Sequence, residues 1–358
     1  MLRDEIHGRK AGRFTLQWHL THACDLHCRH CYDRTNPRVL RYEQAIAVLD
    51  DYERFLEKNE LEGNVCLSGG NPVLYPWFFE LYQEVANRGH RLSILGNPIE
   101  RDQLERMVAI QPPAYFQVSL EGLEEHNDHI RGAGFYQRVL EFLPMLKDVG
   151  VRSVVMTTLT DANMEQIIPL SDLLRGKADR FNFNRLSQVG EGAALGLPDT
   201  EAYGRFMVDY LVARRNNPGM GIKDNLFNIY FHELGYPLFG GCTGKGCGAA
   251  FNFVAVLPDG DVHACRKFPS PLGNLLQSSL SEIYASDEAQ KYRRGCSACD
   301  GCAIRAKCGG CLAVTAGHGR DPFTEVDPHC FMEHQAPEAG LDQEAAAGQA
   351  PVADAPAE

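Results

Sequence analysis

Three cysteines near the start of the chain have a spacing that suits a metal cluster. Cys24, Cys28 and Cys31 lie in the segment HACDLHCRHCYD, residues 22–33. Three thiolates on one short loop can each bind one iron of an iron–sulfur cube. The fourth iron then lacks a protein ligand, and an open metal position is where substrate chemistry takes place. The alternative is a zinc site completed by one of the histidines in this segment.

A second group of cysteines lies between residues 242 and 330. Its nine members are Cys242, Cys247, Cys265, Cys296, Cys299, Cys302, Cys308, Cys311 and Cys330. The N-terminal sequence MLRDEIHGRK has no apolar signal-peptide segment, so we expect a cytoplasmic protein without disulfides. Clustered cysteines in such a chain more often bind metal, either iron–sulfur clusters or two structural zinc ions. The thirteenth cysteine, Cys66, lies in an apolar run and is interpreted as a core residue.

The charge and the apolar runs exclude two classes of partner. The formal net charge of −12 argues against nucleic acid, whose phosphates need a basic surface. No apolar run approaches the roughly 20 residues that span a bilayer, so no membrane contact is expected. Residues 335–358 are rich in Ala, Pro and acidic side chains, and we interpret them as a disordered acidic tail.

Residues 14–216 alternate between β-rich runs and amphipathic helical patterns. The expected strands are 14–20, 63–67, 91–95, 114–119, 151–157 and 180–184. The expected helices are 41–58, 76–88, 100–109, 135–149, 163–174 and 199–216. Successive βα units predict an α/β fold with a parallel sheet, here a (βα)6 partial TIM-like barrel. Such barrels place their chemistry at the C-terminal ends of the strands, and the first cysteine motif follows the first strand.

The pattern changes on both sides of this barrel. Residues 1–13 form an N-terminal extension and residues 217–240 a connector. Residues 241–334 have little apolar periodicity and many cysteines, which predicts a small domain held together by metal. Its segment 254–265, VAVLPDGDVHAC, predicts a hairpin that we expect to lie over the mouth of the barrel.

The first motif and the segments after it resemble the radical S-adenosylmethionine (radical SAM) superfamily. CxxxCxxC is the signature of that family, SGGNP (68–72) is similar to its GGE-type motif, and VSLEG (118–122) to its VSLDG segment. The resemblance implies a [4Fe-4S] cluster that binds S-adenosylmethionine and yields a 5′-deoxyadenosyl radical, which abstracts a hydrogen from substrate. It assigns S-adenosylmethionine binding to Gly69, Gly70, Asn71, Ser119 and Arg131. For Gly69 and Gly70 the alternative is a plain Gly-rich turn. For Arg131 the alternative is a surface arginine.

The later cysteines resemble the SPASM domain of radical SAM peptide maturases. The resemblance implies two auxiliary [4Fe-4S] clusters, and thus three clusters in all. Cluster I would be bound by Cys242, Cys247, Cys265 and Cys311. Cluster II would be bound by Cys299, Cys302, Cys308 and Cys330. Cys296 is left over, and its spacing to Cys299 leaves open a ligand set shifted by one cysteine.

Together these resemblances imply an oxidoreductase that oxidatively cross-links a residue of a ribosomally made precursor peptide. A selenobiotic-type maturase is the suggested subgroup, and flavodoxin or ferredoxin the expected electron donor. One alternative is the anaerobic sulfatase-maturing, formylglycine-forming type. That type has an Asp after the cysteine equivalent to Cys265, whereas this chain has Arg266 and Lys267, which we expect at the barrel mouth. The other alternative is a non-catalytic iron–sulfur or zinc protein, and the sequence assigns no acid or base.

Overall fold

The computed structural model describes residues 12–32 and 38–332 and contains the predicted six-strand parallel sheet. Its strands are β1 (Arg13–His19), β2 (Glu62–Ser68), β3 (Arg91–Leu95), β4 (Phe116–Ser119), β5 (Ser153–Leu159) and β6 (Arg180–Arg185). Neighbours in the chain are neighbours in the sheet, and all five pairs are parallel. The (βα)6 prediction is therefore confirmed. The predicted acidic tail, and all but the end of the N-terminal extension, lie outside the described residues.

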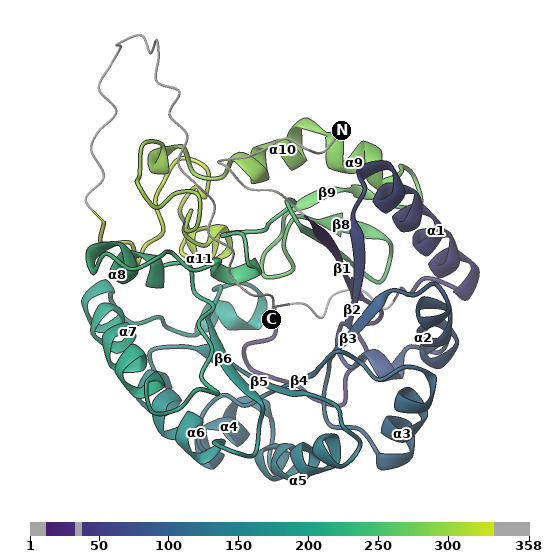
Figure 1. Cartoon of the computed structure of the whole chain (residues 1–358), viewed down its shortest axis with the longest axis horizontal. Helices are drawn as coiled ribbons and strands as arrows, with labels where there is room; N and C mark the ends of the chain where they lie inside the picture. Colours follow the sequence, from purple (N-terminus) through teal and green to yellow (C-terminus); the bar gives the residue numbers. More distant parts are fainter. Residues whose placement is uncertain (1–11, 33–37, 333–358) are drawn as a thin grey trace.

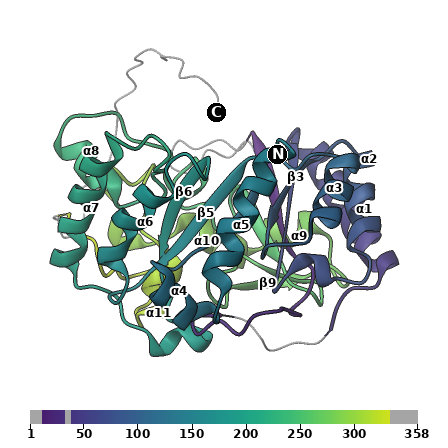
Figure 2. The ribbon, with the colours of Figure 1, turned by 90° about the horizontal axis from the view of Figure 1, so that it is seen from below.

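The predicted helices cover the outer face of this sheet (Figure 1). They are α1 (Tyr42–Asn59), α2 (Phe78–Asn87), α3 (Arg101–Ile110), α5 (Phe135–Asp148), α6 (Ile167–Leu173) and α7 (Thr200–Arg214). In Figure 2, α1–α3 and α6–α8 lie at opposite ends of the molecule with β5 and β6 between them. None of the helices in the described residues has both the length and the apolar character needed to cross a bilayer.

Alternation along β1 shows how strand and helix pack. Phe14, Leu16 and Trp18 are almost fully buried, and the Phe14 ring lies 4.7 Å from that of Phe55 in α1. The Tyr52 hydroxyl, also in α1, donates a 2.6 Å hydrogen bond to the Phe14 carbonyl oxygen. The odd-numbered residues of β1 therefore point toward the barrel interior. The loop after His19 starts at the rim of the barrel.

Between residues 14 and 240, two helices of the described chain were not predicted. Helix α4 (Glu124–Arg131) has only two buried side chains, Asn127 and Ile130, so it carries too little apolar periodicity to be recognised. Helix α8 (Phe227–Glu233) lies within the connector. Both are short, and both carry or neighbour residues of the site described below.

The C-terminal segment extends the barrel sheet, and this corrects the expected position of its hairpin. Strand β7 (Phe253–Val256) pairs in parallel with β1, and β8 (Asp261–His263) and β9 (Pro271–Asn274) follow it in antiparallel order. The turn predicted at 258–260 is present. The hairpin does not lie over the mouth, because the open edge of β1 offers unpaired backbone groups that β7 can pair with.

The segment also contributes more to the core than expected. Val254, Val256 and Val262 are fully buried in the main core. Helix α9 (Leu280–Ala285) packs beside α1, where the Tyr284 ring lies 5.6 Å from that of Phe14. Helices α10 (Asp287–Arg294) and α11 (Leu312–Gly317) follow α9. This part of the chain spans the gap between β9 and β6 (Figure 1). The cysteine-rich part thus forms the remaining wall of the barrel.

Candidate active site

The first cysteine loop is held against the loop that follows β2. The Gly70 amide donates to the Thr21 carbonyl at 2.7 Å, and the Asn71 amide donates to the Ala23 carbonyl at 2.8 Å. A β-carbon at Gly69 would lie 2.4 Å from the Thr21 carbonyl oxygen, and one at Gly70 would lie 2.3 Å from that of Ala23. Only glycine allows this approach, so the paired glycines set the position of the cysteines.

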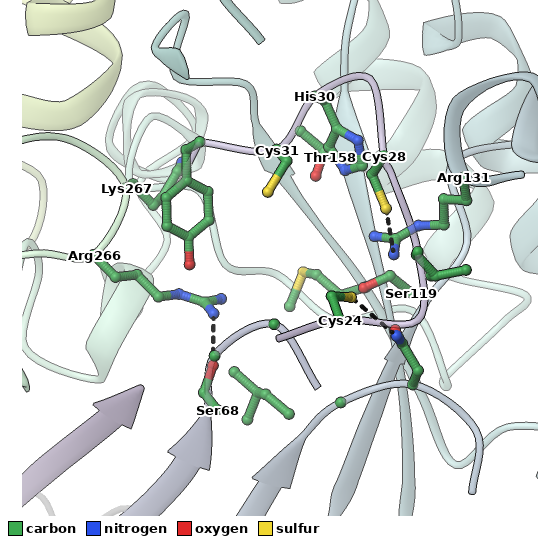
Figure 3. A pocket seen from close by; sticks show the side chains of 18 of the residues that line it. Cys24, Cys28, His30, Cys31, Ser68, Ser119, Arg131, Thr158, Arg266 and Lys267 are labelled. Atoms are coloured by element: carbon green, nitrogen blue, oxygen red, sulfur yellow. Dashed lines mark hydrogen bonds between the residues drawn. The ribbon is translucent and has the colours of Figure 1, made fainter. Parts of the chain in front are cut away.

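Cys24, Cys28 and Cys31 line one cavity of about 360 Å³ at the C-terminal ends of the strands. Figure 3 shows the three thiols around its centre. Four of the five residues expected to bind S-adenosylmethionine line the same cavity, namely Gly69, Gly70, Ser119 and Arg131. The three cysteines and these four residues therefore face a common space.

The fifth, Asn71, lies behind the loop and does not line the cavity. Its side-chain amide donates to Asp25 at 3.1 Å, next to the 2.7 Å hydrogen bond from Asn97. Arg138 adds a third contact to Asp25 at 3.1 Å. Burial raises the pKa of Asp25, but these donors outweigh it and the net pKa is lowered. Asn71 thus supports the cysteine loop through Asp25, a residue that the sequence motifs do not mark.

Arg131 is an internal residue rather than a surface arginine. Its Nε donates to Glu121 at 2.9 Å, and its Nη1 lies 3.8 Å from Cys28 Sγ. Burial alone would raise the pKa of Glu121, but Arg131 and His30 hold it down at about 2. The fork expected to bind a ligand carboxylate is therefore occupied by Glu121, and the guanidinium places positive charge beside Cys28 (Figure 3).

Other cavity residues come from strand ends that the sequence motifs do not mark. They include Asn97, Gln117, Met156, Thr158 and Asn184. The rule that barrels place ligand-binding residues at the C-terminal ends of strands would have found them once strand boundaries were known. Asn163 ties two of these loops together, because its side-chain amide donates to the carbonyls of Glu121 and Thr158.

The cysteine geometry can be compared with the two metal chemistries. All thirteen thiols are free of disulfides. Within residues 12–32 and 38–332, no three His, Cys, Asp or Glu side chains are placed to share one metal ion. A zinc ion needs its donors crowded within about 2.3 Å of one point, whereas the thiolates of a cube bind different irons and lie farther apart. Three free thiols on one loop, each available to a different iron, are a donor set that fits an iron–sulfur cluster.

The structure gathers eight later cysteines into two groups. Burial raises the pKa of the Cys247 thiol to about 12, and the nearby thiols of Cys311, Cys265 and Cys242 raise it as well. These four are the residues expected for cluster I. Their ligand roles stay predictions.

The second group contains the residues expected for cluster II. A hydrogen bond with Cys296 raises the pKa of Cys299 most, followed by burial and then by charges that include Cys308 and Cys330. Burial raises the pKa of Cys330 to about 11, with Cys302 among the neighbours that add to it. The leftover Cys296 therefore lies directly beside one member of this group.

Arg266 and Lys267 lie in the cavity wall, on the side opposite Arg131 (Figure 3). Arg266 Nη1 lies 3.5 Å from Ser68 Oγ at the end of β2. Lys267 Nζ donates to the Arg185 carbonyl at 2.8 Å, at the end of β6. The residues after Cys265 therefore reach both edges of the mouth, as the sequence predicted, although the hairpin before them lies in the sheet.

This fold, with three free thiols in an open cavity and a cysteine-rich wall, is the arrangement that the resemblance to radical SAM enzymes implies. Residues 18–174 match the family model of the Radical SAM superfamily, and residues 247–311 match that of SPASM, an iron–sulfur cluster-binding domain. The chain therefore contains a radical SAM domain followed by a SPASM domain. Members of this superfamily use a [4Fe-4S] cluster with S-adenosylmethionine, and a SPASM domain adds further iron–sulfur binding.

Named relatives and solved structures extend the match along the chain. The mycofactocin maturase MftC of Mycolicibacterium smegmatis is 28% identical, over 90% of this chain and 83% of MftC. The pre-heme d1 synthase of Dinoroseobacter shibae is 27% identical, over 88% of this chain and 85% of that protein. The crystal structure of Streptococcus suis SuiB bound to S-adenosylmethionine has a TM-score of 0.67 and 19% identity, covering 91% of this chain and 79% of SuiB. SuiB has also been solved bound to its precursor peptide SuiA.

Proposed function

We propose that this chain is a peptide maturase that oxidatively cross-links a residue of a ribosomally made precursor peptide. We place it in the cytoplasm, with flavodoxin or ferredoxin as electron donor. One observation carries the proposal: the first cysteine loop and the residues after Cys265 line the same cavity. The likeness to MftC over most of both chains supports the peptide as substrate class.

The residues of this chain divide the work at the cavity. Cys24, Cys28 and Cys31 would hold the first cluster, and Gly69, Gly70, Ser119 and Arg131 would surround S-adenosylmethionine. When bound, the cluster and S-adenosylmethionine supply a 5′-deoxyadenosyl radical that removes one hydrogen atom from the substrate. The protein binds, orients and shields the reacting groups, as in other cofactor enzymes. Arg131, held by Glu121, would place its guanidinium beside the iron that Cys28 would bind.

The balance of an oxidative cross-link explains the need for the second cysteine region. A product with two fewer hydrogens must lose one hydrogen atom, one further electron and one proton. Cys265 directly precedes two residues of the cavity wall, so a cluster held by Cys265 would lie near enough to the cavity to accept that electron. We propose that Cys242, Cys247, Cys265 and Cys311 bind auxiliary cluster I, and Cys299, Cys302, Cys308 and Cys330 bind auxiliary cluster II.

A heme precursor is the second candidate substrate, favoured by the similarity to the pre-heme d1 synthase. The formylglycine-forming alternative is disfavoured, because the position expected for an acidic base holds Arg266 and its neighbour Lys267. Both side chains line the cavity, and neither is the carboxylate that the formylglycine-forming type carries at this place.

The decisive experiment is anaerobic incubation with the small peptide encoded nearest the gene, followed by mass spectrometry. The proposal expects a loss of two hydrogen atoms that requires S-adenosylmethionine and a reductant. Cys28→Ala is the control and should form no product. An unchanged peptide, alongside conversion of an iron–coproporphyrin, would replace the peptide with a heme precursor as substrate.

A further inference from the structure

The cavity has an unusual charge for so acidic a chain. The formal net charge is −12, yet among the described residues no Asp or Glu lines the cavity. Its wall carries four basic side chains, those of Arg131, Arg185, Arg266 and Lys267. Charges collected in a cleft against the sign of the whole molecule attract a ligand of the opposite charge.

Two of these cations are already neutralised inside the protein. Arg131 is paired with Glu121, whose carboxylate accepts from Nε at 2.9 Å. Arg185 is paired with Asp224 at 2.7 Å and with Asp327 at 2.6 Å. These two arginines therefore have carboxylate partners of their own and hold little charge in reserve for a ligand.

Arg266 and Lys267 have no such partner. In the part of the chain that the structure describes, neither forms a salt bridge with a carboxylate, and the side-chain hydrogen bonds of both go to neutral oxygens. Arg266 has one long contact with Ser68 Oγ at 3.5 Å, and Lys267 donates to the carbonyl of Arg185 at 2.8 Å. Half-buried adjacent cations without counter-ions are costly to desolvate. Their N–H groups have donor capacity left for a ligand.

The neighbouring cysteines offer a simpler explanation, in which the pair balances an anionic cluster at Cys265. The directions of the side chains argue against it as the sole role. Arg266 reaches the end of β2 and Lys267 reaches the end of β6, so the two extend across the barrel mouth and into the cavity (Figure 3). A pair serving only the cluster would not need to line the cavity with Cys24 and Cys31.

We propose that Arg266 and Lys267 bind a carboxylate of the substrate and thereby hold the residue to be modified in front of the Cys24–Cys31 loop. The inference rests on the proposed function, since it takes the substrate to be a peptide. A peptide offers this chemistry from two sources, an acidic side chain or its C-terminal carboxylate. Charge-assisted hydrogen bonds from a guanidinium and an ammonium suit either source.

The test measures binding of three short probes to the fully reconstituted chain with S-adenosylmethionine present. The probes are acetyl-Gly-Glu-Gly-amide, acetyl-Gly-Gln-Gly-amide and acetyl-Gly-Gln-Gly with a free carboxylate, titrated calorimetrically under nitrogen. We expect at least one carboxylate probe to bind about tenfold more tightly than the neutral one, as a charge-assisted pair would give. The preference should fall as salt is raised. Comparison of the two carboxylate probes separates side chain from terminus.

The variants are Arg266→Gln and Lys267→Gln, with the exposed Arg320→Gln and Lys177→Gln as charge-matched controls. The carboxylate preference should disappear in the first two and persist in the controls, with S-adenosylmethionine affinity changed less than about twofold. Equal binding of all three probes to the wild type overturns the proposal. A loss of S-adenosylmethionine affinity with unchanged probe binding also overturns it, because the pair would then serve the cofactor. Probe binding is independent of turnover, so an unmodified precursor peptide would contradict only the proposed function.

Discussion

Arg185 and Asp327 form a buried two-pronged ion pair that joins the barrel to the cysteine-rich segment. Nη1 donates to Oδ1 at 2.6 Å and Nη2 donates to Oδ2 at 2.7 Å, with both side chains almost fully buried. Arg185 ends β6, while Asp327 also accepts from the Cys311 amide at 2.8 Å. Because Asp327 lies just before Cys330, one carboxylate connects both cysteine groups to the end of a barrel strand.

Breaking this pair should cost much of the stability of the protein. Arg185→Met leaves Asp224 and Asp327 buried without their shared cation, and we expect a loss of about 3–5 kcal/mol in the free energy of unfolding. Urea unfolding of anaerobic protein measures it. Arg205→Met, which breaks an exposed pair with Glu201, is the control and should cost less than about 1 kcal/mol. Equal urea midpoints for the two variants would show that the buried pair holds nothing together.

Iron content tests the assignment of the first cluster. Reconstituted wild-type protein should hold about twelve irons, and the triple change of Cys24, Cys28 and Cys31 to Ala should leave about eight. Iron and acid-labile sulfide assays give the count, and Cys66→Ala is the control that should retain all iron. Stoichiometric zinc with little iron in anaerobically purified protein would contradict the assignment.

The motif cysteines and the six-strand barrel were predictable, because both depend on local pattern. Spacing along the chain reveals a cysteine set, and alternation reveals a buried strand such as β1. The pairing of β7 with β1 was not predictable, since it joins Phe253 to Thr15 and no local signal records which edge a strand selects. The same holds for Arg185 with Asp327: each looks like an ordinary charged residue until the fold brings them together.

Cys296 and Cys299 should differ in iron binding. The thiols of Cys308 and Cys330 lie close enough to Cys299 to raise its pKa. The cysteine that shifts the pKa of Cys296 is Cys299. We therefore expect Cys296→Ala to retain all iron and Cys299→Ala to lose about four irons. The pair of variants is its own matched control. The reverse result would shift the ligand set by one cysteine.

Changing Asn71 to the glutamate that is usual in the family motif should weaken the protein rather than improve it. Substitution by Glu restores the usual family residue, but here it would place a second carboxylate against Asp25, which accepts from Asn71 at 3.1 Å. Asn71→Glu should destabilise the fold by about 1–3 kcal/mol and weaken S-adenosylmethionine binding. Asn71→Ala, which leaves the donors Asn97 and Arg138 in place, should cost about 1 kcal/mol. Tighter S-adenosylmethionine binding by Asn71→Glu in calorimetry would show that this side chain turns into the cavity.

The pairing of β1 with β7 also has a consequence for the order of synthesis. Strand β1 leaves the ribosome before the other five strands of the parallel barrel sheet, while Phe253–Val256 emerges only after them. Throughout that interval the edge of β1 remains open to pairing with another chain. The nascent barrel therefore depends on residues 253–256 to cover the edge of β1, and the time needed to synthesise them sets how long a growing chain stays at risk of aggregation.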